Sequence, residues 1–539
     1  MEEVELVVLL LAVVAAGTLL ARRIGVPYPI LLVVVGLALG LVPGVPRVEL
    51  EPETVLLVFL PPILFSTAFF LSPRELWRNV RPISLLAVGL VITTTLAVAG
   101  VARVLVPDMP WAVALALGAI VSPPDAIAAT TIGRRLNLPR RLVFIMEGES
   151  LVNDATALTI YRLAVVAVGA TTLTAAEAAA TFAFVAIGGI AVGLAIGAIA
   201  SWLLSLFDDP PVEVLVSLIV PFAAYLPAES IGASGVLATV AAGLFVGWRA
   251  SRVMTSNTRI LGTATWKMVI FVVNGLAFLL IGLQLPTVIE DVEGREPMEL
   301  LVMAAAISLT VIVVRLLWIY PATYLPRWLI PSVARRDPAP PARVPVILGW
   351  AGMRGAVSLA AALALPPTIA SGAFPERGLV IYLTFSVILV TLIGQGLTLP
   401  LLIRRLRVTD DGQTQHEEVH ARTVAAEAAL ERLDSLETEV PGHVPLINQL
   451  RDRYRHQGEH LAHDHDGDDG GVTGGDGIAQ AEEMTPEEVE EMEHDDIRRA
   501  VIAAQRLAII ALRDRGEIGD EALRGVERDL DLDELRREA

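Results

Sequence analysis

Three polar side chains that suit a cation site share one face of an apolar segment. Ser150, Asn153 and Asp154 lie within Glu147-Gly-Glu-Ser-Leu-Val-Asn-Asp. Their spacing of i, i+3 and i+4 places a hydroxyl, an amide and a carboxylate on the same side of a helix. Oxygen ligands suit a hard alkali cation, whereas imidazole or thiolate would suit a transition metal. A polar seam between packed helices would explain Ser150, but it explains Asp154 poorly.

A second carboxylate follows two prolines in another apolar run. Pro123 and Pro124 precede Asp125, and neither proline has a backbone N–H to donate. The helix is therefore expected to open here and to leave free carbonyl groups beside Asp125. The alternative is a simple kink with Asp125 facing a crevice. An ionisable side chain inside a membrane is costly, so each one indicates a functional site.

A third segment, Gly349-Trp-Ala-Gly-Met-Arg-Gly, places Arg354 among glycines that tolerate an interrupted helix. A lone buried guanidinium is unstable, so it needs an acidic partner. We predict that this partner is Glu149, on the other side of its helix from the cation ligands, and that the pair is structural. Arg162 and Arg315 also lie within apolar runs, where we expect them to snorkel toward the membrane surface.

The apolar runs that carry these residues are long enough to cross a membrane. Hydrophobic residues make up 54% of the chain and its mean hydropathy is +0.62, well above the values of a soluble enzyme. Many runs reach the roughly 20 residues that span a bilayer core. We predict an all-α membrane protein with thirteen spans, at about 4–21, 27–44, 53–71, 82–104, 111–132, 141–169, 180–207, 212–227, 231–249, 266–285, 299–326, 345–367 and 378–404.

The two spans with breaks, 111–132 and 345–367, are the fifth and the twelfth. This placement predicts two inverted repeats, spans one to six and eight to thirteen, with the seventh as a linker. Interrupted helices at matching positions of two halves are typical of a transporter site near the middle of the membrane.

Loop charge predicts the orientation of the spans. When the loops alternate sides, twenty basic residues fall on the side of the loop at Arg22 and four fall on the other side, at Arg47, Arg103, Arg295 and Arg377. Cytoplasmic loops carry the excess of basic residues. We therefore expect the N-terminus outside and the C-terminal tail inside a bacterial plasma membrane. The acidic loop at 208–213 lacks basic residues and fits this pattern least well.

Charge also divides the chain into a membrane domain, 1–407, and an acidic tail, 408–539. The tail holds 35 of the 59 acidic residues, 14 of the 41 basic residues and all eight histidines. Segment 456–477 is predicted to be disordered; its histidines could bind a metal, although a solvated acidic linker explains them more simply. Residues 481–538 resemble charged amphipathic helices for dimer contact or regulation. Without cysteines the chain has no disulfides, and nothing indicates a cofactor or a nucleic-acid partner.

At its motifs the chain resembles the sodium/proton exchangers of the monovalent cation–proton antiporter group, in the NhaP/NHE-like branch. The resemblance covers about 1–407 and rests on Phe59-Leu-Pro-Pro-Ile-Leu-Phe, Ser-Pro-Pro-Asp-Ala, Gly148-Glu-Ser-Leu-Val-Asn-Asp-Ala, Gly235-Val-Leu-Ala, Ala242-Gly-Leu and Gly352-Met-Arg-Gly-Ala-Val-Ser. It implies a homodimer with thirteen spans, two crossing unwound helices and an elevator-like motion. It also implies roles for individual residues. Asp154 corresponds to the essential cation- and proton-binding carboxylate, Asn153 to its neutral neighbour and Ser150 to an accessory ligand. Asp125 corresponds to the acid of the fifth span, and Glu149 with Arg354 to a stabilising pair.

Two positions depart from the pattern of this family. Many relatives have Thr where this chain has Pro124, so a hydroxyl ligand is lost and only a carbonyl remains. Many also carry an acid where this chain has Ser66, which removes a second membrane carboxylate. Both departures affect which cation the site prefers, so K⁺ remains an alternative to Na⁺ as the transported cation.

The resulting hypothesis is a secondary antiporter, not an enzyme, that exchanges Na⁺ (or K⁺ or Li⁺) for H⁺ in pH and cation homeostasis. One titrating carboxylate beside an uncharged Asn153 predicts electroneutral one-for-one exchange. An intramembrane aspartyl protease built on Asp125 and Asp154 is the first rival, but a Gly-x-Gly-Asp motif precedes neither residue. A cation channel is the second rival, and the chain lacks the repeated filter loops typical of channels.

Overall fold

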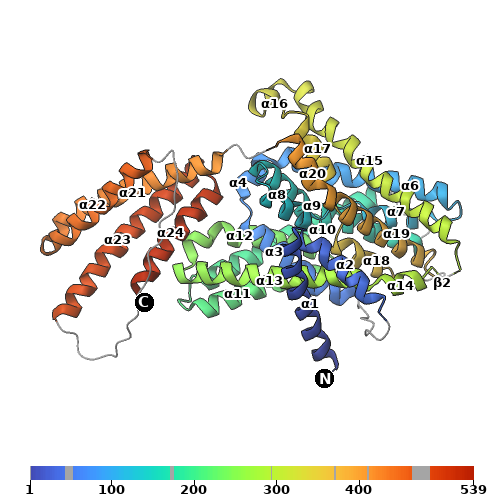
Figure 1. The fold of residues 1–539 in the computed structure, drawn as a ribbon, viewed down its shortest axis with the longest axis horizontal. Helices are drawn as coiled ribbons and strands as arrows, with labels where there is room; N and C mark the ends of the chain where they lie inside the picture. The colour runs from blue at the N-terminus through green and yellow to red at the C-terminus, as the bar shows by residue number, and fades with distance from the viewer. Residues whose placement is uncertain are drawn as a thin grey trace. The chain divides into compact units, whose positions relative to one another are not determined.

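The chain folds almost entirely into helices. The computed structural model describes residues 2–42, 52–169, 175–292, 294–369, 372–408, 412–463 and 486–538. Within these ranges the one sheet is a hairpin in which β1 (Thr368–Ile369) pairs antiparallel with β2 (Gly372–Ala373). The chain divides into two compact units (Figure 1), composed of Met1–Leu206, Leu215–Ala250 and Ala264–Asp410, and of Phe207–Val214, Ser251–Thr263 and Asp411–Ala539.

The helices that precede the tail follow the apolar runs of the sequence. They are α1 (Glu2–Ile24), α2 (Tyr28–Gly40), α3 (Pro52–Phe70), α4 (Pro73–Arg78), α5 (Val80–Ser84), the π-helix η1 (Leu85–Leu90), α6 (Val91–Leu105), α7 (Trp111–Val121), α8 (Ala126–Arg135), α9 (Arg140–Gly169), α10 (Ala175–Leu204), α11 (Pro210–Ser230), α12 (Gly235–Val253), α13 (Ser256–Leu283), α14 (Leu285–Glu290), α15 (Pro297–Leu329), α16 (Pro331–Arg336), α17 (Arg343–Trp350), α18 (Ala356–Leu363), α19 (Arg377–Leu389), the π-helix η2 (Val390–Gln395) and α20 (Gly396–Leu406).

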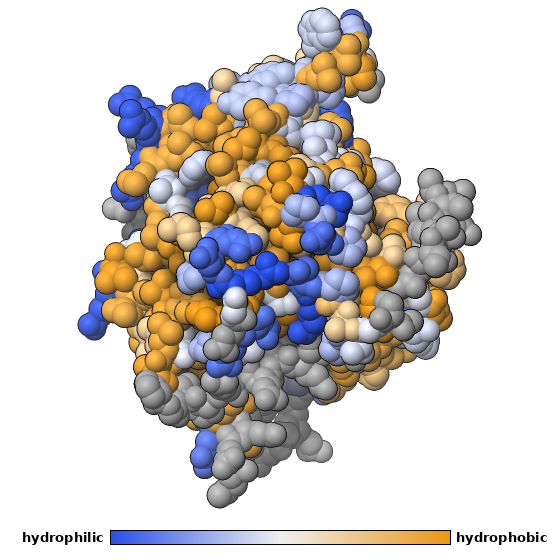
Figure 2. Space-filling model, turned by 90° about the vertical axis from the view of Figure 1, so that its right-hand side faces the viewer, coloured by the Kyte–Doolittle hydropathy of each residue, from blue (hydrophilic) through white to orange (hydrophobic). Residues whose placement is uncertain are grey.

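Ten helical stretches of the described residues are long and apolar enough to cross a membrane, and α2 and the apolar part of α3 are shorter candidates. Large apolar side chains on these helices are exposed, including Ile187, Leu309 and Val104, and hydrophobic atoms cover much of the face drawn in Figure 2. Surface of this kind is stable only in contact with lipid. The prediction of an all-α membrane protein is therefore confirmed, whereas thirteen spans in two inverted repeats stay a prediction.

Both expected breaks in the helices are present. The first lies between α7, which ends at Val121, and α8, which begins at Ala126. The second lies between α17 and α18, where Ala351–Gly355 are not helical. The prolines and glycines that predicted them occupy the breaks themselves, so the local sequence accounts for both openings.

Four helices make up most of the tail: α21 (Gln413–Glu439), α22 (Val444–His463), α23 (Pro486–Arg515) and α24 (Asp520–Glu538), with the short 3₁₀-helix η3 (Pro441–His443) between the first two. They lie alongside one another in Figure 1 and enclose two apolar clusters, one around Ile509 and the other around Leu433. Most of segment 456–477, which we predicted to be disordered, lies outside the described residues.

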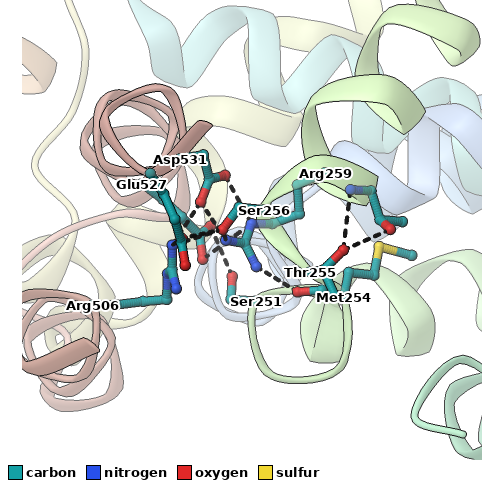
Figure 3. A network of polar contacts seen from close by, with 10 residues as sticks. Ser251, Met254, Thr255, Ser256, Arg259, Arg506, Glu527 and Asp531 are labelled. Carbon is teal, nitrogen blue, oxygen red and sulfur yellow. Dashed lines mark hydrogen bonds and ion pairs between the residues drawn. The ribbon is translucent and has the colours of Figure 1, made fainter. Parts of the chain in front are cut away.

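The segment Ser251–Thr263, which runs from the end of α12 into the start of α13, belongs to the same unit as the tail and contacts α24 through polar side chains (Figure 3). Arg259 pairs with Asp531, and Ser251 donates a hydrogen bond of 3.0 Å to Glu527. Arg506 of α23 also binds Asp531, at 2.8 Å. Burial raises the pKa of Glu527, although the positive charge of Arg259 opposes the shift. The sequence did not predict these ion pairs between the segment Ser251–Thr263 and the tail.

Candidate cation site

The two interrupted helices are joined to each other by one hydrogen bond between backbone groups and one that a side chain donates to the backbone. The amide N–H of Asp125 donates to the carbonyl of Met353 over 2.7 Å. In the other direction, Nε of Arg354 donates to the carbonyl of Val121, also over 2.7 Å. A Cβ atom at Gly355 would overlap the Asp125 carboxylate, so only glycine permits this approach. The broken segments therefore cross in direct contact.

Asp125 caps the helix that follows the first break. Its Oδ1 accepts a hydrogen bond of 2.8 Å from the backbone N–H of Ile127, in the first turn of α8. An ionised carboxylate at this position also interacts favourably with the positive end of the helix dipole. The second carboxylate oxygen remains available on the side of Gly355.

The carbonyl of Pro124, which the break releases, is held by two side chains of α9. Asn153 donates its amide to this oxygen over 3.2 Å, and the Ser150 hydroxyl donates to it over 3.4 Å. Ser150 also accepts from the backbone N–H of Ala126. These contacts fix the face of α9 that carries Asp154 against the first break.

A cavity of about 100 Å³ lies beside the crossing. Ser150 and Asp154 line it, as their helical spacing predicted, together with Asp125 and Pro124 of the first break, whereas Asn153, which shares that spacing, does not. The Asp154 side chain is only 6% exposed, and within the described residues no group donates a hydrogen bond to its carboxylate. A space of this size holds a small cation with one or two waters, so Asp154 is placed to meet an ion inside the protein.

Burial decides what the Asp154 carboxylate can do. Removing a carboxylate from water disfavours its charged form unless a proton or a cation neutralises it. The Asp125 carboxylate adds repulsion, and the described residues that line the cavity include Glu147 but no basic side chain. The arrangement therefore favours occupation of Asp154 by either a proton or a cation.

The prediction that Glu149 forms its ion pair with Arg354 is wrong. The Glu149 carboxylate accepts two hydrogen bonds, at 2.5 and 2.9 Å, from the guanidinium of Arg315 on α15, and both side chains are buried. Arg315 was expected to snorkel, yet α15 turns it inward. Arg354 instead donates to the carbonyls of Val121 and Gly352, because the breaks leave these oxygens without helical partners.

Arg162 does not snorkel freely either, since it forms an ion pair of 2.6 Å with Glu229 of α11. The sequence analysis also missed Asn274 of α13, which lines the cavity with Ala277 and Phe278. A lone amide inside an apolar run was its only signal.

Crossed interrupted helices that position buried carboxylates in a multi-span helical protein define a secondary ion transporter. The chain belongs to the sodium/hydrogen exchanger family, because residues 8–405 match the model of the family's transmembrane region. The residues that carry the proposed site, from Asp125 to Arg354, all lie within this match.

Relatives from several organisms support the assignment. A Na⁺/H⁺ exchanger of Mycobacterium tuberculosis is 35% identical over 98% of this chain and 95% of its own length. A sodium, potassium, lithium and rubidium/H⁺ antiporter of Bacillus pumilus is 32% identical over 83% of this chain and 69% of its own. Among solved structures, the sodium proton antiporter MjNhaP1 of Methanocaldococcus jannaschii matches 74% of this chain and 100% of its own, with a TM-score of 0.58 and 18% identity, and so shares the fold.

Proposed function

We propose that this chain exchanges an alkali cation, primarily Na⁺, for H⁺ across the membrane, with Asp154 as the shared binding group. The observation that carries the proposal is the Asp154 carboxylate, which lines a cavity at the helix crossing without a hydrogen-bond donor among the described residues. Membership of the sodium/hydrogen exchanger family supports the same activity.

Competition at one carboxylate couples the two fluxes. Asp154 holds either a proton or a partly dehydrated cation, and Ser150 and Asp125 supply further oxygens. If the site changes sides only when its charge is neutralised, each cation that crosses in one direction is matched by a proton in the other. Asn153 is uncharged and lies outside the cavity, so we propose electroneutral one-for-one exchange.

K⁺/H⁺ exchange is the second candidate. The relative from Bacillus pumilus is named for sodium, potassium, lithium and rubidium, which supports a broad cation range for this architecture. Pro124 offers no hydroxyl to the cavity, and Ser66 does not line it. Neither position therefore supplies a side-chain ligand to the cavity.

We further propose the setting in which exchange takes place. The chain lies in a bacterial plasma membrane with its N-terminus outside and its tail in the cytoplasm, as the loop charges favour. It forms a homodimer, needs no cofactor and serves pH and cation homeostasis. The elevator-like motion expected from the family resemblance would move the crossed helices together.

Cation-induced pH change in proteoliposomes tests the proposal. Addition of Na⁺, Li⁺ or K⁺ outside vesicles that contain the purified chain should alkalinise the lumen as H⁺ leaves in exchange. Asp154→Asn, which keeps the shape and removes the titrating group, should abolish the signal for every cation. Ser66→Ala is the control outside the cavity and should keep it. Full exchange by the Asp154→Asn variant would refute the proposal.

A further inference from the structure

Asn274 presents a buried amide oxygen to which no described residue donates a hydrogen bond. Its side chain is 3% exposed on α13, and Oδ1 has no hydrogen-bond donor among the described residues. A buried acceptor without a donor is unfavourable, so such an atom calls for a specific explanation.

The position of Asn274 supplies that explanation. Asn274, Ala277 and Phe278 form one face of α13, and this face lines the cavity that Asp154 and Ser150 line from α9. Tyr28 of α2 interacts with the Asn274 side chain. Because Oδ1 has no donor among the described residues, this contact falls to the amide nitrogen, and the oxygen keeps its full capacity as an acceptor.

The rest of this wall offers little to a cation. The residues that α3 contributes are Leu60, Ile63, Leu64 and Thr67. The Thr67 hydroxyl donates to the carbonyl of Ile63 over 2.8 Å, which leaves the lone pairs of its oxygen, and Ala277 and Phe278 are apolar. Among the described residues on this side, Asn274 Oδ1 is the buried oxygen that has no hydrogen-bond partner at all.

We propose that Asn274 Oδ1 is a cation ligand from α13, opposite Asp154, and that it helps to determine which cation binds. The inference rests on the proposed antiport at the same site and adds a ligand and a basis for selectivity to it. An amide oxygen has the hard character that alkali cations prefer. It replaces a hydration water without adding a charge, so the net charge of the occupied site is unchanged.

Removal of this oxygen should weaken cation binding more than proton binding. Na⁺ holds its hydration shell more strongly than K⁺, so each lost protein oxygen costs Na⁺ more. Asn274→Leu keeps the volume and removes the oxygen. We expect it to raise the apparent KM for Na⁺ about tenfold and the KM for K⁺ less, while the maximal rate is kept. Asn274→Asp keeps an oxygen at this position and should bring the KM for Na⁺ back toward that of the parent.

Ser308→Ala is the matched control. The Ser308 hydroxyl on α15 is also buried and without a donor or acceptor in the described parts of the chain, but Ser308 does not line the cavity. Loss of a buried polar atom as such would affect Asn274→Leu and Ser308→Ala alike. Under the proposal, Ser308→Ala has the KM of the parent for both cations.

The experiment measures exchange in proteoliposomes as a function of Na⁺ and K⁺, and in parallel the rise in Tm that Na⁺ causes in detergent, which needs no transport. A higher KM for Na⁺ and a smaller rise in Tm in Asn274→Leu, with partial recovery in Asn274→Asp, support the ligand role. A KM and a Na⁺-induced rise in Tm equal to those of the parent overturn it, as does a lower maximal rate at unchanged KM. Exchange that persists in Asp154→Asn would refute the proposed function instead, so the two failures are distinguishable.

Discussion

The guanidinium of Arg315 forms a buried, two-point ion pair with the carboxylate of Glu149, which ties α15 to α9. Because Glu149 precedes Ser150 on α9, this pair fixes the helix that carries the proposed site. The two side chains are 2% and 1% exposed, so neither charge can turn to water if its partner is removed.

Arg315→Ala should therefore be strongly destabilising. Breaking a buried ion pair from one side leaves an unpaired charge and costs roughly 3–5 kcal/mol. We expect a clear fall in Tm and a poor yield of folded protein. The control is Arg162→Ala, because the pair of Arg162 with Glu229 is partly exposed and such pairs contribute about 0–1 kcal/mol. Equal Tm values for the two variants would contradict this account of the pair.

Gly355→Ala should disrupt the helix crossing. The added Cβ would overlap the carboxylate of Asp125, which must then leave its capping position at α8. We expect exchange to be lost in a protein that still reaches the membrane, as measured in proteoliposomes. Gly394→Ala is the control, since a Cβ there meets nothing within 4 Å. If both variants exchange like the parent, the crossing tolerates a side chain at Gly355, and Gly355 does not lie in direct contact with the Asp125 carboxylate.

The proposed orientation predicts which loops react with an impermeant thiol reagent. The chain has no cysteine, so single substitutions report without background. Cysteine at Glu296, which is exposed just before α15, should be labelled from outside the cell. Arg335→Cys, at an exposed position of α16, should react only after the membrane is permeabilised. The reverse labelling pattern would show that the protein has the opposite orientation in the membrane.

Exchange should be insensitive to membrane potential. One carboxylate that carries either one proton or one monovalent cation moves no net charge per cycle. A net charge would couple to the potential with about 2.3 kcal/mol per 100 mV, which is easily measured. We expect the equilibrium of exchange to stay the same when a K⁺/valinomycin potential is imposed during Na⁺/H⁺ exchange. A shift of the equilibrium would show that a second group, with Asp125 the first candidate, also titrates.

Attachment of α24 to the segment Ser251–Thr263 should weaken as the pH rises through the raised pKa of Glu527. The pKa of Glu527 is raised by burial against this segment, so its protonation favours the attached state. That contribution is complete below the ordinary pKa of glutamate and is lost as the pH rises through the raised value. The pKa of Glu534 is lowered, since the hydrogen bonds and charge of Arg506 outweigh its burial. This second group weakens the contact only in acid.

Limited proteolysis of the tail across a pH series measures this effect. In the parent, cleavage near α24 should increase as the pH rises from the ordinary pKa of glutamate through the raised pKa of Glu527. Glu527→Gln cannot ionise and should flatten the increase, whereas Glu431→Gln, at an exposed position of α21, should retain it. Identical curves for the parent and Glu527→Gln would assign the change to another group.

Much of the membrane architecture could be predicted from the sequence, because hydropathy and broken-helix residues act locally. Pro123 and Pro124 mark the first break, and the glycines around Arg354 mark the second. Helical spacing alone places Ser150 and Asp154 on one face of α9, and both line the cavity.

Partners far apart in the chain could not be predicted in this way. Arg315 and Arg354 both lie in apolar runs, and no periodicity tells which helix packs against Glu149. Asn274 looked like any polar residue in a span, because its significance comes from the cavity that α3, α8, α9 and α18 complete. The contact of Arg259 with Asp531 joins residues 272 positions apart, and charge patterns alone do not specify such a pairing.

The hydrogen bonds between Asp125 and Met353 and between Arg354 and Val121 join the two interrupted helices, so we expect these helices to move together. The wall that α3 and α13 form opposite these helices carries no comparable bond to them among the described residues. The oxygens around a bound cation would then come from both sides, so a displacement of one side would lower the coordination number of the ion. The same displacement would change both the affinity of the site for the cation and the access of the site to water. Release of the cation would then need no separate gate.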